Sequence, residues 1–169
     1  LADTPEGLLL GTFGGLYRWA GGRFSQLAAV PTQRIRGLLR MDDGSVLVGL
    51  DRGVGRLRDG RFETLPGIGA LAQAQVVKLR PDGHGAVLAA AAVDGVWRIE
   101  GDSAQRLDEP DGLPIRDVHR DAEGRLWLAS IGLYWLDGRR LRPVQPVTQA
   151  FNTQFHALRA AATGRLRPR

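Results

Sequence analysis

Basic side chains occupy equivalent places in a repeating sequence. Arg36, Arg116 and His156 each lie two residues before an apolar residue that recurs about every 40 positions, and Val77 takes this place in the remaining copy. Guanidinium and imidazolium groups brought together would receive a carboxylate or another anionic ligand, such as a sugar acid. They converge near one axis if the strand that follows them is the innermost of each unit. Otherwise they are polar residues on the solvated face of a strand.

A second group of polar and aromatic residues falls in turns between two predicted strands of each unit. These turns contain Phe13, Asp51, Arg52 and Asp94. They would line the same face as the basic residues, or they are ordinary turn residues, since Asp and Gly are favoured in turns for backbone reasons. The candidate ligand-binding set is therefore Arg36, Arg116, His156, Phe13, Asp51, Arg52 and Asp94.

The sequence contains no catalytic or metal-binding motif. Its histidines, His84, His119 and His156, fall in three different units without the spacing of metal ligands. There is no cysteine to supply a thiolate, and neither a Gly-x-Ser-x-Gly motif nor a phosphate-binding glycine loop is present. We therefore predict no catalytic centre, no metal site and no cofactor.

A repeated turn-and-strand pattern must position these residues. Each copy has a glycine followed by an apolar strand, beginning at Gly7, Gly44, Gly85, Gly124 and Gly164. The repeat length of about 40 residues, with strand-like contents, is typical of propeller blades rather than of helical repeats.

The second unit shows the strands of one blade most completely. Apolar and polar residues and intervening turn signals predict strands at residues 35–41, 45–50, 53–58 and 61–65. Asp59-Gly60 is a strong hairpin signal before the last of these. Four antiparallel strands in each of several radial units define a propeller, whereas a sandwich or a β-helix would not explain so regular a period.

We therefore predict an all-β fold, a single partial β-propeller over residues 1–169. Four four-stranded antiparallel blades are expected at about residues 1–27, 35–65, 76–107 and 115–144, and the first strand of a fifth within residues 155–169. Both ends fall inside a unit, so a larger ring or a compact closure of four blades is expected. A partial ring leaves blade edges and faces uncovered, which predicts self-association.

The charge of the chain does not favour nucleic-acid binding. The net charge is +5 and the pI about 10.8, and almost all the basic residues are arginines. These arginines are spread over every unit rather than gathered in a basic run, as expected for solvated strand faces. No apolar stretch approaches the ~20 residues of a membrane helix, so contact with a membrane is expected only through parts of a larger protein.

The fourth unit carries the most specific motif. It reads Asp121-Ala122-Glu123-Gly124-Arg125-Leu126-Trp127 after the linker Asp111-Gly112-Leu113-Pro114, and the first unit adds Leu10-Gly11-Thr12 followed by Gly15-Leu16. This pattern resembles the two-component regulator propeller repeat over essentially the whole chain. A WD-type propeller fits worse, because no unit has the Gly-His or Trp-Asp signature.

The resemblance implies a sensory role. Such repeats form the extracytoplasmic, periplasmic input region of bacterial membrane sensors, ahead of a histidine-kinase or diguanylate-cyclase output domain. The segment itself would then be non-catalytic and would bind a small molecule or a glycan. Two other functions stay open: a protein-interaction scaffold, and a propeller enzyme of the lyase or glycosidase type, which rests on the shared fold alone.

Overall fold

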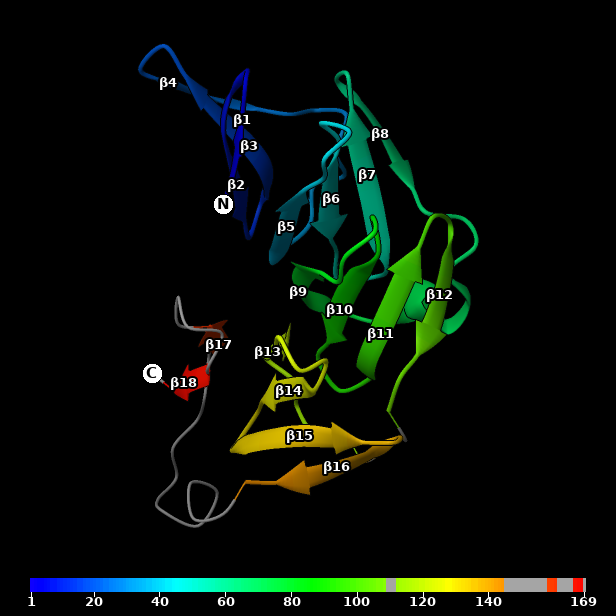
Figure 1. The fold of residues 1–169 in the computed structure, drawn as a ribbon. Coiled ribbons are helices and arrows are strands. Elements are labelled where there is room, and N and C mark those ends of the chain that lie inside the picture. Colours follow the sequence, from blue (N-terminus) through cyan, green and yellow to red (C-terminus); the bar gives the residue numbers. More distant parts are fainter. Residues whose placement is uncertain (109–111, 145–157, 161–165, 169) are drawn as a thin grey trace.

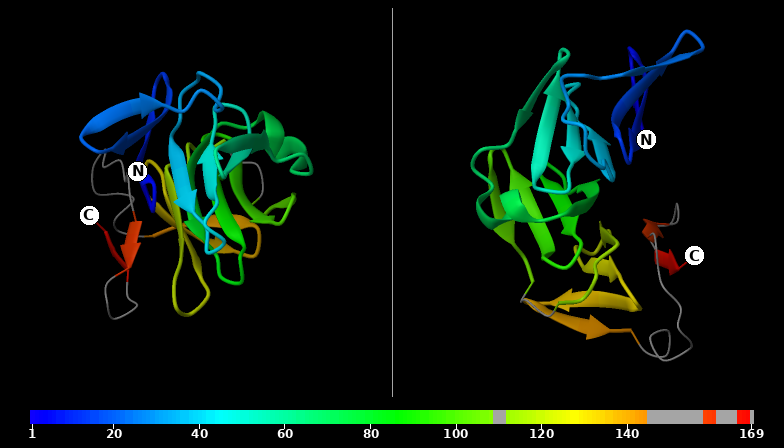
Figure 2. Two further views of the ribbon diagram at one scale, coloured as in Figure 1. Left: turned by 90° about the horizontal axis from the view of Figure 1, so that it is seen from above. Right: turned by 180° about the vertical axis from the view of Figure 1, so that it is seen from behind.

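The computed structural model describes residues 1–108, 112–144, 158–160 and 166–168, and it consists almost entirely of β-strands. Four four-stranded antiparallel sheets follow one another along the chain, each with its strands hydrogen-bonded in sequence order. Figures 1 and 2 show the sheets arranged radially, as an arc of blades. The predicted all-β propeller fold with about four blades is thus confirmed.

The strands of the four blades have the following bounds. Blade 1 contains β1 (Ala2–Thr4), β2 (Gly7–Thr12), β3 (Gly15–Ala20) and β4 (Arg23–Gln26). Blade 2 contains β5 (Gly37–Arg40), β6 (Val46–Gly49), β7 (Val54–Arg58) and β8 (Arg61–Thr64). After the short 3-10 helix η1 (Gly69–Gln73), blade 3 contains β9 (Val76–Pro81), β10 (Val87–Ala91), β11 (Gly95–Glu100) and β12 (Ser103–Arg106). Blade 4 contains β13 (Asp117–Arg120), β14 (Leu126–Ala129), β15 (Leu133–Asp137) and β16 (Arg140–Pro143).

Two details differ from the sequence prediction. The innermost strand of blade 2 is shorter than residues 35–41, because the Ile35 N–H donates to the Thr12 carbonyl of blade 1 and Met41 closes the following turn. The fifth unit contains two paired strands, β17 (Leu158–Ala160) and β18 (Leu166–Pro168), rather than one. Strand β17 lies against β13 and β14, where a compact closure of four blades would need blade 1.

Blades 2, 3 and 4 each bury an apolar sheet face against the blade before them. Val46, Val48 and Leu57 of blade 2 pack with Leu9 and Leu16 of blade 1. Blades 3 and 4 repeat this arrangement with other aliphatic and aromatic residues at the same strand positions. Because successive residues of a strand point to opposite sheet faces, alternate residues along each strand contact different neighbouring blades.

Small residues on the second strand allow neighbouring blades to approach closely. A Cβ atom on Gly11 would lie 2.8 Å from the Ile35 carbonyl oxygen, and one on Gly49 would lie 2.8 Å from that of Val76. In each case the contacted atom is backbone at the start of the next blade, which cannot rotate away. Glycine is required at these two positions by the spacing of the blades.

Substitution of Gly49 tests this packing constraint. We expect Gly49→Ala to lower the free energy of unfolding by about 1–3 kcal/mol, since the methyl group forces blades 2 and 3 apart. Gly14→Ala is the matched control, because Gly14 lies in an exposed turn with no atom within 4 Å of an added Cβ. Urea unfolding of both variants measures the difference, and equal stabilities would contradict the packing account.

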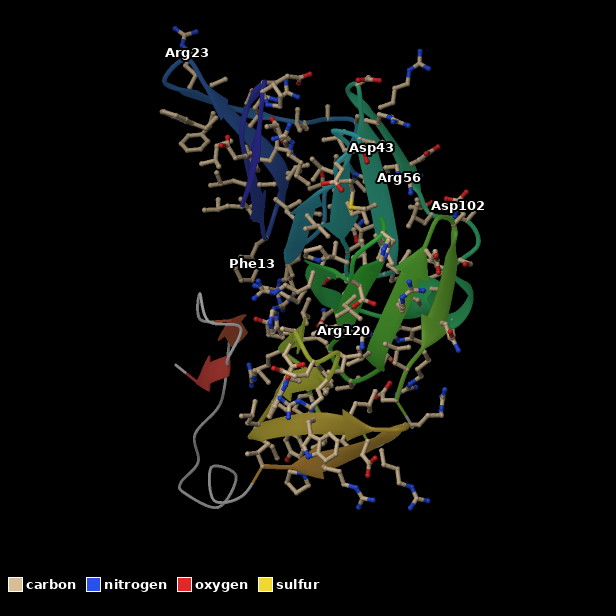
Figure 3. The ribbon with its side chains drawn as sticks, viewed as in Figure 1. Phe13, Arg23, Asp43, Arg56, Asp102 and Arg120 are labelled. Atoms are coloured by element: carbon tan, nitrogen blue, oxygen red, sulfur yellow. The ribbon has the colours of Figure 1, made fainter. Side chains whose placement is uncertain are left out.

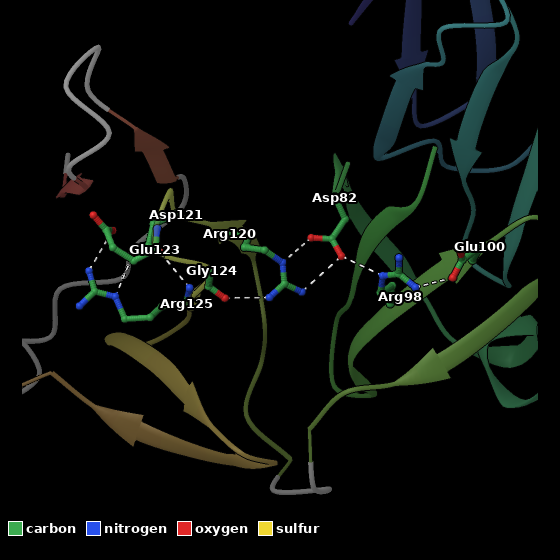
Figure 4. Close-up of polar contacts among 8 residues, drawn as sticks. All are labelled: Asp82, Arg98, Glu100, Arg120, Asp121, Glu123, Gly124 and Arg125. Carbon is green, nitrogen blue, oxygen red and sulfur yellow. Dashed lines mark hydrogen bonds and ion pairs between the residues drawn. The ribbon is translucent and has the colours of Figure 1, made fainter. Parts of the chain in front are cut away.

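Arginine–aspartate pairs join blades 3 and 4. The buried Asp82 carboxylate accepts hydrogen bonds from Arg98 of its own blade at 3.0 Å and from Arg120 of blade 4 at 2.6 Å, as Figure 4 shows. Arg80 on β9 forms a bidentate pair with the buried Asp117 of blade 4, at 3.0 and 2.7 Å. Such two-point guanidinium–carboxylate contacts fix the relative orientation of the two sheets.

Asp121 holds the turn between β13 and β14. Its carboxylate accepts hydrogen bonds from the Trp127 indole N–H at 2.7 Å and from the Arg125 backbone and guanidinium N–H groups at 2.8 and 2.9 Å. Burial alone would raise the pKa of the Asp121 carboxyl, but these hydrogen bonds outweigh it and hold the pKa below its ordinary value.

The lowered pKa makes the contribution of Asp121 to the free energy of unfolding dependent on pH. It is complete above the unfolded-state pKa of about 3.9 and is lost as the pH falls through the lower native pKa. We expect Asp121→Asn to reduce the free energy of unfolding by about 2 kcal/mol at pH 7, and by much less at pH 2. Denaturant unfolding at both pH values measures this, and an equal loss at both would show that the charge of Asp121 is irrelevant.

Candidate functional site

The predicted basic residues of blades 2 and 4 lie around one pocket. Arg36, Val77 and Arg116 line a cavity of about 430 Å³ together with Gln75, Ala92, Pro114 and Ile115. Arg36 comes directly before β5 and Arg116 directly before β13, and Val77 is the second residue of β9. The residues two positions before the repeating apolar anchor therefore converge, as the repeat predicts for the innermost strand. We call this cavity the axial pocket.

Backbone hydrogen bonds fix the segments that carry these side chains. The Arg36 N–H donates to the Gly49 carbonyl at 3.3 Å, and the Arg116 N–H donates to the Ala129 carbonyl at 2.8 Å. Between blades 3 and 4, the Ile115 N–H donates to the Ala92 carbonyl at 2.6 Å. The walls of the pocket are thus sheet edges and their continuations, a rigid support for a binding site.

Positive charge predominates at the axial pocket. The Arg36 side chain is exposed and makes no hydrogen bond or ion pair with the residues that the structure describes. The nearby Asp51 carboxylate accepts a hydrogen bond from the Gln75 side-chain amide at 2.9 Å. Asp51 therefore orients a pocket-lining amide, and the guanidinium groups of Arg36 and Arg116 give the pocket a positive character.

The other predicted site residues that the structure describes lie outside the lining of the pocket. Arg52 is exposed and Asp94 half-buried, with the Asp94 carbonyl accepting a hydrogen bond from the Trp97 indole at 2.9 Å. Phe13 is 77% exposed and the Arg34 guanidinium lies over its ring, 4.1 Å from the ring centre. Figure 3 shows Phe13 at one end of the blade-1 sheet and Arg23 at the other. His156 lies outside the described residues.

Apolar residues occupy the tips of equivalent turns. Phe13, Val93 and Ile131, between the second and third strands of blades 1, 3 and 4, are 77%, 60% and 50% exposed. Asp51 takes the corresponding place in blade 2. Sequence reasoning selected Phe13 but missed Val93 and Ile131, although alignment of the turns would have found them. It also missed Gln75, because the linker before β9 has no counterpart of equal length in the other units.

A second pocket, of about 280 Å³, lies between blades 2 and 3. It is lined by Met41, Asp43, Arg56 and Gly101, among others. Asp43 already accepts hydrogen bonds from Ser45 at 2.6 Å and from Arg58 at 3.0 Å, and Arg56 lies 3.7 Å from Asp102. Its charged groups are therefore engaged within the protein, so it is a weaker candidate than the axial pocket.

The described part of the chain offers no cluster of three or more His, Asp or Glu side chains placed to hold a metal ion. Within the same residues, no helix is long and apolar enough to cross a membrane. The described tryptophans are divided between blades: Trp97 is buried in blade 3, whereas Trp127 and Trp135 are half-buried and pair with each other on β14 and β15 of blade 4. Trp19 of blade 1 is 44% exposed.

Solved structures share this fold at low sequence identity. The extracellular domain of a one-component system protein from B. thetaiotaomicron matches 96% of this chain with a TM-score of 0.78 and 18% identity. The extracellular domain of a hybrid two-component system protein from the same organism matches 95% with a TM-score of 0.69 and 16% identity. The chain spans 24% and 23% of the lengths of these two structures.

An enzyme has a similar fold. Catalytically inactive virginiamycin B lyase from Staphylococcus aureus matches 89% of this chain with a TM-score of 0.66 and 16% identity, over 54% of its own length. No family model and no curated protein sequence matches the chain. The chain is thus a segment of a β-propeller, and the resemblance to two-component regulator propellers agrees with its sensor-domain neighbours at the level of the fold.

Two substitutions compare the contribution of a pocket arginine to stability with that of a structural ion pair. We expect Arg36→Ala to change the free energy of unfolding by less than about 0.5 kcal/mol, because the side chain is exposed and unbonded. We expect Asp82→Ala to cost about 3 kcal/mol, because it removes the buried partner of Arg98 and Arg120. Urea unfolding measures both, and a large loss in Arg36→Ala would assign Arg36 a structural role.

Proposed function

We propose that this propeller segment is a non-catalytic, ligand-sensing part of a bacterial signal-transduction receptor and that it binds an anionic ligand in the axial pocket. The observation that carries the proposal is the placement of Arg36 and Arg116, from blades 2 and 4, around one pocket. Two guanidinium groups on opposite sides of blade 3 would hold a carboxylate or sulfate group through charge-assisted hydrogen bonds.

Arg36 differs from five arginines that are paired within the protein, and this difference supports an external ligand. Arg80, Arg98, Arg106, Arg120 and Arg125 each pair with a carboxylate of the protein. Arg36 has no such partner among the described residues, although Asp51 lies in the neighbouring turn and is instead bonded to Gln75. An arginine held in a pocket without a counter-charge is suited to an anion supplied by the solution.

The chemistry of the pocket and the fold support a ligand class and a location. Gln75 supplies an amide beside the two arginines, which suits the hydroxyl groups of a sugar acid or an acidic glycan as well as a small carboxylate. The sensor domains with the same fold are extracellular. We place this segment outside the cytoplasm, in the periplasmic region of a membrane sensor whose output domain is a kinase or a cyclase.

A protein-interaction scaffold is the second candidate. The exposed apolar turn tips Phe13, Val93 and Ile131 favour it, since large apolar side chains at equivalent solvent-facing positions suit contact with a protein surface. Under this alternative the same loops receive a protein, and the axial pocket needs no small ligand.

Titration with acidic and neutral sugars tests the proposal. We expect tri-galacturonate to shift the amide NMR signals of residues around the axial pocket, with maltotriose producing no shift. Arg36→Ala and Arg116→Ala should each weaken binding about 10-fold or more, the effect of losing a hydrogen bond to a charged group. Arg23→Ala is the control, because Arg23 is exposed at the far end of blade 1 (Figure 3).

Three results would count against the proposal. Equal amide shifts with the neutral sugar would exclude recognition of charge. Equal affinities of Arg23→Ala and Arg36→Ala for the acidic sugar would show that it does not bind at Arg36. Absence of saturable shifts with tri-galacturonate, free galacturonate and a sulfated disaccharide, combined with capture of a protein by wild type but not by Phe13→Ser, would favour the scaffold.

A further inference from the structure

The axial pocket presents several hydrogen-bond donors but a single side chain that can accept. Among the lining residues that the structure describes, most have apolar side chains, and the guanidinium groups of Arg36 and Arg116 only donate. The remaining residue is Gln75, whose amide has a donor atom and an acceptor atom. The orientation of this amide therefore decides whether the pocket requires a ligand that brings a hydrogen-bond donor of its own.

Asp51 determines the orientation of the Gln75 amide. Its carboxylate accepts a hydrogen bond from Gln75 Nε2 at 2.9 Å, and a carboxylate can only accept. Reversal of the amide would place Gln75 Oε1 against Asp51 Oδ1, two oxygen atoms with no proton between them. Asp51 lies outside the pocket lining, so Nε2 is engaged from outside the pocket. Oε1 accepts no hydrogen bond from a described residue and is the atom left for a ligand.

Backbone hydrogen bonds hold together the two segments that carry this side-chain contact. The Gly53 N–H donates to the Ala74 carbonyl at 2.9 Å, and the Val76 N–H donates to the Leu50 carbonyl at 2.9 Å. These bonds lie on either side of the contact in both segments. The turn between β6 and β7 is therefore fixed on the linker before β9, and the amide is supported by a rigid neighbour rather than by a loose surface contact.

Backbone acceptors around the pocket are already engaged. The Gln75 carbonyl accepts a hydrogen bond from the Ala92 N–H at 2.8 Å, and the Ala92 carbonyl accepts one from the Ile115 N–H at 2.6 Å. The Pro114 carbonyl accepts a hydrogen bond from the Ser130 hydroxyl at 3.0 Å. A donor group on a ligand in this pocket is therefore best received by the side-chain oxygen of Gln75.

We propose that Asp51 is a positioning residue that makes the axial pocket selective for hydroxycarboxylates. The ligand hydroxyl donates to Gln75 Oε1 while Arg36 and Arg116 hold the carboxylate. This inference rests on the proposed anion-binding function of the pocket and narrows its ligand class. A carboxylate without a hydroxyl group leaves Oε1 unpaired in the complex, which weakens binding. An ammonium group would also donate to Oε1, but the two guanidinium groups repel it.

Two small ligands of equal charge test this selectivity. Tartrate and succinate are both dianions at neutral pH, and only tartrate has hydroxyl groups beside its carboxylates. In NMR titrations of the wild-type chain, tartrate should bind at least about 5-fold more tightly than succinate. Asp51→Asn should bring this ratio close to one, because an amide at this position both donates and accepts and no longer fixes Gln75. The affinity for succinate should not fall, because the variant removes a negative charge near the pocket.

Three further variants separate positioning from charge. Gln75→Leu removes the acceptor and should also equalise the two ligands. Asp59→Asn makes the same charge change at the exposed hairpin between β7 and β8 of the same blade and should keep the wild-type ratio. Arg36→Ala should weaken both ligands by similar factors, because it acts on the carboxylate. The side-chain amide signals of Gln75 report its orientation without any ligand, and they should move in Asp51→Asn but not in Asp59→Asn.

The possible failures are distinguishable. Equal wild-type affinities for tartrate and succinate, both weakened by Arg36→Ala, would overturn the selectivity and leave the anion-binding function standing. A wild-type ratio that persists in Asp51→Asn, or in Gln75→Leu if Asp51→Asn does not fold, would overturn the positioning role. Absence of saturable binding of tartrate, succinate and tri-galacturonate would overturn this inference together with the proposed function.

Discussion

Burial of one sheet face against the preceding blade is the constraint on which the rest of this structure depends. A single four-stranded blade is too small to remove its apolar residues from water, so each blade is stabilised by its neighbours. Gly11 and Gly49 bring the next blade within contact distance, and the aliphatic residues around Leu9, Val48 and Leu47 fill the space between sheets. The blades are therefore arranged radially, and this arrangement places the residues before β5, β9 and β13 around one pocket.

The charged residues divide into two groups with different tasks. At the boundary between blades 3 and 4, Asp82 and Asp117 are almost fully buried and their charge is used within the protein, by Arg98, Arg120 and Arg80. At the axial pocket, the Arg36 side chain makes no hydrogen bond or ion pair with a described residue, and Asp51 accepts a hydrogen bond from Gln75. The first group orients the sheets, and the second gives the axial pocket its positive character.

The repeat in the sequence predicted the fold because glycine turns and alternating strands are local signals that recur in every unit. It also predicted that Arg36 and Arg116 converge, since equivalent positions in radial blades face one axis. It did not predict the role of Gln75, which depends on the linker containing η1, or the Asp82–Arg120 pair, which joins residues 38 positions apart. Trp19 is 44% exposed although the residues at the same strand position of blades 2 and 3, Leu57 and Ile99, are buried, because burial at this position requires a preceding sheet. The ligand-binding roles of Arg36, Arg116, Phe13, Asp51, Arg52, Asp94 and His156 stay predictions.

The convergence of blades 2 and 4 on the axial pocket is the central claim, and a distance between them tests it most directly. The chain contains no cysteine, so Arg36→Cys and Arg116→Cys introduce two unique attachment sites for spin labels. Pulsed electron paramagnetic resonance on the doubly labelled protein should give one narrow distribution of label-to-label distances, at short distance. A broad or long distribution would contradict the radial packing that places these two residues around one pocket.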